Sequence, residues 1–202
     1  MKHTPLTLLT VISLALVGCG STQADSEPQN AEEAQQQYKD MLESGEAQGP
    51  PPMPAGEFEL QASQGTHITF ELPTDPAHES LQSIEEYREA LDLEPVTYIV
   101  AEVDNRQGDS PVTLADIYVY DPDGTEYIFS SAGPIVSRWD TPTDETYYMS
   151  QDIREELSQD VQPAGKDELI LIYEGDDLAD EFTRVAAWPT GPGDAEEAYL
   201  AD

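Results

Sequence analysis

Seven short runs of strand-forming residues lie between residues 57 and 188, and turn-forming residues separate them. In the first run, Phe58, Leu60 and Ala62 alternate with polar residues, which is typical of a strand with one buried face. Seven such runs with little helix between them predict an all-β domain, built as a β-sandwich. The runs cover residues 57–62, 66–72, 96–103, 112–120, 126–130, 168–173 and 182–188.

Local signals add turns and a helix to this pattern. Gly65 lies between the first two runs and indicates a hairpin, and the sequence DPDG at 121–124 indicates a tight turn. Asp75 can cap a helix whose apolar residues recur as far as Leu91. The run at 96–103 is apolar on both faces, so we expect it to be a central strand.

The stretch from residue 133 to residue 162 is long for a connection between strands, and its topology stays open at this point. We expect a short helix after Ser150. Long insertions often carry functional surfaces. Three aromatic residues of this stretch could anchor a partner or fold back onto the core, and the sequence favours neither; they are Trp139, Tyr147 and Tyr148.

The start of the chain has the pattern of a secretory signal. A short basic start precedes a near-continuous apolar run from Leu6 to Val17, which is shorter than the roughly 20 residues that span a bilayer. The end of this run resembles the lipobox of bacterial lipoproteins, namely Leu16, Val17, Gly18 and Cys19. The resemblance implies a signal peptide over residues 1–18, and a cysteine that receives a diacylglyceryl group and then palmitate-type acyl chains.

Cys19 is the only cysteine, so a disulfide within the chain is excluded. Residues 19–56 are polar, acidic and proline-rich, which predicts a disordered stalk between the lipidated cysteine and the domain. We place the folded domain at residues 57–190. Residues 191–202 are expected to form a flexible acidic tail.

Three short motifs of the domain carry a further resemblance. They are EVDN at 102–105, DPDG at 121–124 and PAGK at 163–166, the last leading into an apolar strand. Their order is similar to that in immunoglobulin-like domains of unknown function found in bacterial surface lipoproteins. The resemblance implies that the sandwich is immunoglobulin-like, with about seven strands and one or two short helical insertions.

The formal charge of the chain is −34, from 42 acidic and 8 basic residues. A field of this sign repels nucleic acid and anionic lipid headgroups, so we expect no nucleic-acid partner and no flat contact with a membrane surface. It favours a cationic ligand, a basic protein surface or divalent ions. Solubility in an exposed environment is the simplest reason for such a charge.

Calcium binding is the main alternative reason for the charge, because calcium takes six to eight oxygen ligands. Two acidic loops supply carboxylates, but neither matches the twelve-residue calcium-binding hand loop, so we interpret both as surface turns and assign no metal site. The candidate residues are Asp121, Asp123 and Glu126 in one loop, and Asp176, Asp177, Asp180 and Glu181 in the other.

The sequence favours binding over catalysis. After the signal, only His67 and His78 remain as histidines, and neither lies in a nucleophile or metal-binding motif. We therefore assign no catalytic residue and no cofactor, and the one site residue is Cys19, as the membrane anchor. Carboxylate pairs arise by chance among so many acids and assign no site.

The expected function is that of a lipid-anchored, extracytoplasmic module that binds a protein or ligand at the bacterial cell surface. Its membrane contact is the lipid on Cys19, on the outer face of the cell membrane or in the outer membrane. Its partner would be an envelope protein or a cationic ligand. The alternatives are a divalent-cation-binding or structural envelope lipoprotein and, behind these, a small hydrolase.

Overall fold

The structure, a computed structural model, describes residues 51–62, 65–139, 141–189 and 195–201. They belong to one unit, Gly49–Asp202. The predicted signal peptide, the lipidation site Cys19 and most of the predicted stalk lie outside the described residues. Among the helices that the structure describes, none is long and apolar enough to cross a membrane.

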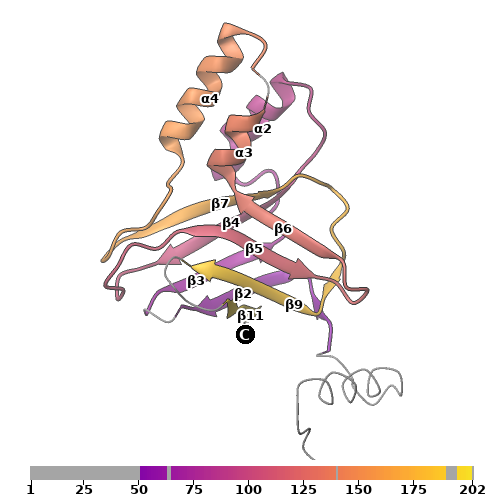
Figure 1. The fold of residues 1–202 in the computed structure, drawn as a ribbon, viewed down its shortest axis with the longest axis vertical. Helices are drawn as coiled ribbons and strands as arrows, with labels where there is room; N and C mark the ends of the chain where they lie inside the picture. The colour runs from indigo at the N-terminus through magenta and orange to yellow at the C-terminus, as the bar shows by residue number, and fades with distance from the viewer. Residues whose placement is uncertain (1–50, 63–64, 140, 190–194, 202) are drawn as a thin grey trace, which may run out of the picture. The chain divides into compact units, whose positions relative to one another are not determined.

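Nine antiparallel strands form one sheet in the order β10–β9–β5–β6–β7–β4–β3–β2–β11 (Figure 1). Their bounds are β2 Gly56–Gln61, β3 His67–Leu72, β4 Thr97–Asp104, β5 Leu114–Tyr120, β6 Glu126–Ser131, β7 Lys166–Tyr173, β9 Arg184–Pro189, β10 Glu196–Glu197 and β11 Tyr199–Leu200. Two further short strands pair only with each other, β1 Met53–Pro54 and β8 Glu181–Phe182.

The two ends of this sheet are joined by one short piece of chain. β10 pairs with β9 and β11 pairs with β2, and only Ala198 separates β10 from β11. The Ala198 N–H donates to the Val185 carbonyl at 2.9 Å, and the Ala201 N–H donates to the Glu57 carbonyl at 2.9 Å. Residues 195–201 therefore nearly close the sheet, although we expected a flexible tail over residues 191–202.

The predicted all-β class is confirmed, and each of the seven predicted runs overlaps one of the strands β2–β7 and β9. The immunoglobulin-like β-sandwich is not the specific arrangement observed, because nine strands form a single curved sheet instead of two facing sheets. Alternation of apolar residues tells which face of a strand is buried. It does not tell whether the opposite wall belongs to another sheet or to the same one.

The main core fills the inside of the curved sheet. The inward positions come from the two-residue period of each strand, as in β2, where Phe58 and Leu60 are buried and Glu57 and Glu59 are exposed. The rings of Phe58 and Phe70 stack with centroids 6.0 Å apart, and Phe182 of β8 meets the Phe58 ring edge-on. Every strand from β2 to β9 adds at least one buried residue to this core.

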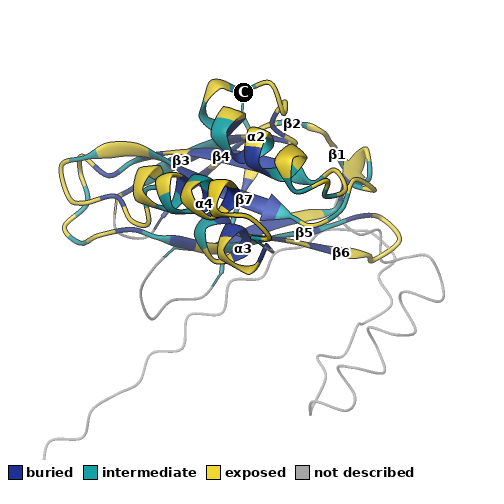
Figure 2. Ribbon diagram, turned by 90° about the horizontal axis from the view of Figure 1, so that it is seen from above, coloured by how far each residue is buried: buried dark blue, intermediate teal, exposed yellow. Residues whose placement is uncertain are grey.

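A second core lies on the outer face of β4 and β7, under the helices. Tyr98 and Val100 of β4, with Ile170 and Ile172 of β7, are buried there (Figure 2). These strands have buried residues on both faces, which explains why the run at 96–103 is apolar on both faces and confirms its central position. Leu81, Ile84, Ile135 and Ile153 of the helices complete this core.

The helices are η1 Glu79–Leu81, α2 Gln82–Ala90, α3 Ala132–Arg138 and α4 Asp144–Glu156, and they gather on one side of the sheet (Figure 1). The helix predicted to follow Asp75 begins at Glu79, because His78 caps it: its Nδ1 accepts the Ser80 N–H at 3.3 Å. The helix predicted after Ser150 begins earlier, where the Thr143 hydroxyl accepts the Thr146 N–H. α3 was not predicted.

Buried Asn105 links two of the motifs that carried the sequence resemblance. Its main-chain N–H donates to the Gly165 carbonyl and its carbonyl accepts the Ala164 N–H, so the end of EVDN meets PAGK directly. Its side-chain amide donates to the carbonyls of Ser110 and Val161, at 2.9 and 2.8 Å. The two motifs therefore form one closed junction at this end of the sheet.

Candidate binding surface

The outer face of β5, β6 and β9 carries large apolar side chains outside both cores. Ile117 and Val119 of β5 point into the main core, so Tyr118 between them points outward. Across the strands, Tyr118 pairs with Ile128 of β6, and its ring meets Trp188 of β9 edge-on at 4.7 Å. Ile128 and Trp188 are each 39% exposed. We call Tyr118, Ile128 and Trp188 the aromatic face.

A pocket of about 690 Å³ lies near this face, at the Tyr120 end of β5. Tyr120 lies two residues after Tyr118 and therefore on the same side of the strand. The Arg184 guanidinium lies over its ring, 5.6 Å from the centroid. Most of the remaining wall is apolar or aromatic. It comes from the segment before β2, from β9 and from the segment that closes the sheet: Pro51, Met53, Val185, Ala198 and Tyr199.

Two polar side chains of this pocket, Tyr120 and Arg184, already have acidic partners. The Tyr120 hydroxyl donates to Glu126 at 2.5 Å, and this hydrogen bond, with a smaller effect from burial, raises the pKa of Tyr120. Arg184 donates to Glu197 from Nε and Nη2, at 2.9 and 2.7 Å, which raises the pKa of Arg184. The pocket therefore offers an apolar wall with a neutralised cation at its edge.

The DPDG turn uses its first carboxylate to hold its own backbone. Asp121 Oδ1 accepts the Thr125 N–H at 2.8 Å, and Oδ2 accepts the Tyr127 hydroxyl at 3.1 Å. Burial works to raise the pKa of Asp121, but these hydrogen bonds outweigh it and hold the pKa below its usual value. The turn predicted at 121–124 is present, with Gly124 at a φ of 84°.

The second acidic loop also contributes an acceptor. Asp177 accepts the Tyr173 hydroxyl at 2.8 Å, and this hydrogen bond, with burial, raises the pKa of Tyr173 to about 12. Among the residues that the structure describes, no three His, Cys, Asp or Glu side chains come together as a group that could hold a metal ion. The candidate calcium residues of the two loops are thus not gathered into one cluster.

The two histidines lie apart and make different contacts. His67 of β3 is 3.1 Å from Glu59 on the neighbouring strand β2. His78 caps η1 through its Nδ1. These contacts therefore give no reason to place the two histidines in one site.

Of the three aromatic residues of the insertion, one folds back onto the core and two stay exposed. Trp139 folds back and is buried, with its ring 5.8 Å from that of Tyr87. Tyr147 and Tyr148 of α4 stay exposed, at 49% and 64%. Tyr147 and Tyr148 lie on the outer side of α4, because the buried side of this helix carries Thr146, Ser150 and Ile153.

Sequence reasoning assigned one site residue, Cys19, which lies outside the described residues, and it missed the aromatic face. The sequence did contain part of the pattern that marks this face. Tyr118 and Ile128 occupy outward positions of predicted strands, where polar residues are usual. Only the order β6–β5–β9 brings them together with Trp188. Comparisons of the chain with protein-family models, with curated proteins and with solved structures found no match.

Proposed function

We propose that this chain is a lipid-anchored module of a bacterial cell envelope that acts by binding a protein or ligand outside the cytoplasm. The observation that carries the proposal is the aromatic face with its adjoining pocket. Aromatic residues that remain exposed beside a stable core are typical anchors of protein interfaces. The lipobox-like end of the apolar run supports the anchor at Cys19 and the location outside the cytoplasm.

The proposed partner is an envelope protein or ligand that carries positive charge next to an apolar or aromatic group. The net charge of −34 attracts such a partner over a long range, Glu197 lines the pocket, and Glu126 accepts a hydrogen bond from the pocket residue Tyr120. The proposed function is that of a tethered binding module, as expected from the sequence, but it does not require an immunoglobulin-like sandwich. A cation-binding or structural role is the second candidate, supported by the charge alone.

The binding surface can be tested by photo-crosslinking in cells. A photoreactive phenylalanine at Ile128 is expected to give one discrete crosslinked product with a protein of the envelope. The matched control carries the same group at Tyr148, an exposed aromatic residue on α4. Crosslinks from position 148 but not from position 128 would place the binding surface on the helices and contradict the proposal.

The anchor is tested separately by metabolic labelling with a fatty acid. The change Cys19→Ala should abolish the label and release or stall the protein, because the thiol is the acceptor of the lipid. The change Ser21→Ala, two residues further on, is the control and should leave labelling intact. Label that persists in the Cys19→Ala protein would rule out the lipoprotein interpretation.

A further inference from the structure

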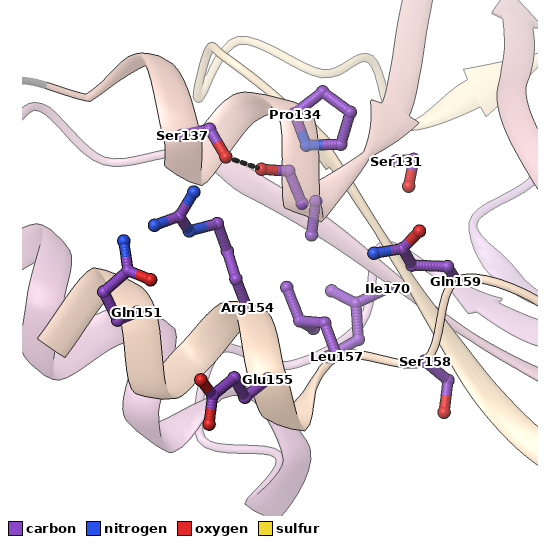
Figure 3. Close-up of a pocket in the computed structure, with 12 residues that line it drawn as sticks. Ser131, Pro134, Ser137, Gln151, Arg154, Glu155, Leu157, Ser158, Gln159 and Ile170 are labelled. Atoms are coloured by element: carbon purple, nitrogen blue, oxygen red, sulfur yellow. Dashed lines mark hydrogen bonds between the residues drawn. The ribbon is translucent and has the colours of Figure 1, made fainter. Parts of the chain in front are cut away.

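A second pocket, of about 530 Å³, lies between α3, the last turns of α4 and β7 (Figure 3). Gln151, Arg154 and Glu155 line it because positions three and four apart share one side of a helix. Leu157 and Ile170 form an apolar floor. The volume falls within the roughly 300–1,000 Å³ of small-molecule sites.

Arg154 differs from every other lysine and arginine in the described part of the chain, because no carboxylate described there lies within ion-pair distance of it. The other Lys and Arg residues there each have one: Arg88 with Glu85, Arg106 with Asp104, Arg138 with Glu174, Lys166 with Glu102, and Arg184 with Glu197. In a chain with 42 acids and 8 bases, an arginine left unpaired beside a pocket is an unusual arrangement.

The guanidinium of Arg154 is oriented by its own helix. Its Nε donates to the Ser150 carbonyl at 3.0 Å, which leaves its two terminal nitrogens as donors. Figure 3 shows this end of the side chain near Ser137, whereas the Glu155 carboxylate lies away from it. The Ser137 hydroxyl donates to the Gly133 carbonyl at 2.7 Å, so its oxygen can still accept but its proton is engaged.

We propose that this pocket binds the carboxylate of a small molecule with an apolar body, and that Arg154 is the residue that holds the carboxylate. Two parallel N–H donors of a guanidinium match the two oxygens of a carboxylate. The apolar body would lie against Leu157 and Ile170. This site is separate from the aromatic face, so its failure would leave the proposed function standing.

The charge of the whole chain narrows the ligand class. A net charge of −34 repels anions over a long range, and the repulsion grows with the charge of the ligand. The chain therefore repels a phosphate ester or a polycarboxylate more strongly than a monocarboxylate. A monocarboxylate carries a single negative charge, which one arginine can neutralise. The pocket thus favours a singly charged or zwitterionic carboxylate.

The test is a titration of the purified full chain with sodium 3-phenylpropionate, followed by saturation-transfer NMR. We expect saturable binding to the unmodified chain. The neutral isostere 3-phenylpropionamide should bind at least about tenfold more weakly, because it cannot form charge-assisted hydrogen bonds with the guanidinium. Arg154→Gln should weaken binding of the acid by a similar factor, and Arg154→Lys should retain part of it.

The matched control is Arg138→Gln, which removes an arginine of α3 that already pairs with Glu174 and should leave the affinity for the acid unchanged. Equal affinity for the acid and the amide, wild-type affinity in Arg154→Gln, or no saturable binding would each overturn the proposal. If Arg154→Gln does not fold, the acid–amide comparison on the unmodified chain and the Arg154→Lys protein still decide the question.

Discussion

Tyr98 lies in the second core with no exposed surface, yet its hydroxyl has a charged partner. It donates to Glu85 of α2, which also accepts from Nε and Nη2 of Arg88, each at 2.9 Å. Arg88 Nη1 donates to the Leu93 carbonyl at 2.6 Å. This arrangement fixes α2 to β4 through groups that would be costly to bury unpaired.

The ionisation of Glu85 should make stability depend on pH. The hydrogen bond from Arg88 is the largest effect and, against the opposing effect of burial, it holds the pKa of Glu85 below its ordinary value of 4.5. Ionised Glu85 therefore stabilises the fold above pH 4.5, and this stabilisation is lost as the pH falls through the lower folded-state pKa. Glu85→Gln should cost about 1–2 kcal/mol at pH 7 and progressively less below pH 4.5.

Chemical denaturation of both proteins at several pH values measures this difference. The control is Glu89→Gln on the same helix, since Glu89 is exposed and lies 3.9 Å from Arg88. Its unfolding curves should follow those of the unmodified protein. A difference for Glu85→Gln that does not change between pH 7 and pH 3 would contradict the account.

Two strands of two residues each decide whether the sheet is open or nearly closed. β10 and β11 satisfy edge groups of β9 and β2 that would otherwise face solvent, and Ala198 between them is buried in the main core. Unpaired edges are sites of unwanted pairing with other chains. The closure therefore protects the two strands that would be edges without it.

A charge at position 198 should open the sheet. Ala198→Asp places a carboxylate in the main core without a partner, which should cost at least about 3 kcal/mol and lower the melting temperature by more than about 6 °C. Tyr199→Ser is the matched control, because Tyr199 is the next residue and is exposed, so its cost should stay below about 1 kcal/mol. Equal melting temperatures for the two variants would mean that the closure contributes little.

The strands of the sheet could be predicted from the sequence because each carries at least six residues of pattern, whereas β10 and β11 have two residues each and no period. α3 escaped prediction since its first turn contains Gly133 and Pro134, which usually indicate a loop but are tolerated where N–H groups lack helical partners. The aromatic face depends on the order of the strands in the sheet. The Arg154 pocket depends on how the helices pack against the sheet. Neither follows from local sequence.

At the scale of the whole molecule, the negative charge must oppose folding. Most acids of the described residues are exposed, and only some of them, such as Asp121 and Asp177, accept hydrogen bonds that hold loops. The rest repel one another through solvent, and this repulsion is long-ranged and screened by salt. The charge therefore lowers stability most when the ionic strength is low.

Sodium chloride should raise the melting temperature steadily between 0.01 and 1 M, because the Debye length falls from about 30 Å to about 3 Å over that range. Calcium chloride at matched ionic strength should add little. A specific site would instead add about 2.7 kcal/mol at 100 times its dissociation constant, a shift of several degrees. A saturable calcium shift below 1 mM that is lost in Asp123→Asn or Asp177→Asn would favour the cation-binding candidate.

The near-closure of the sheet also makes its completion depend on strands from the two ends of the domain. β2 is the first long strand of the domain, and one of its two neighbours, β11, is formed by residues 199–200. Pairing between such distant parts of a chain costs loop-closure entropy and makes folding slower. If the chain leaves the cytoplasm unfolded, this sheet cannot be completed until residue 200 has crossed the membrane. The topology therefore makes completion of the sheet depend on the last strands that the structure describes.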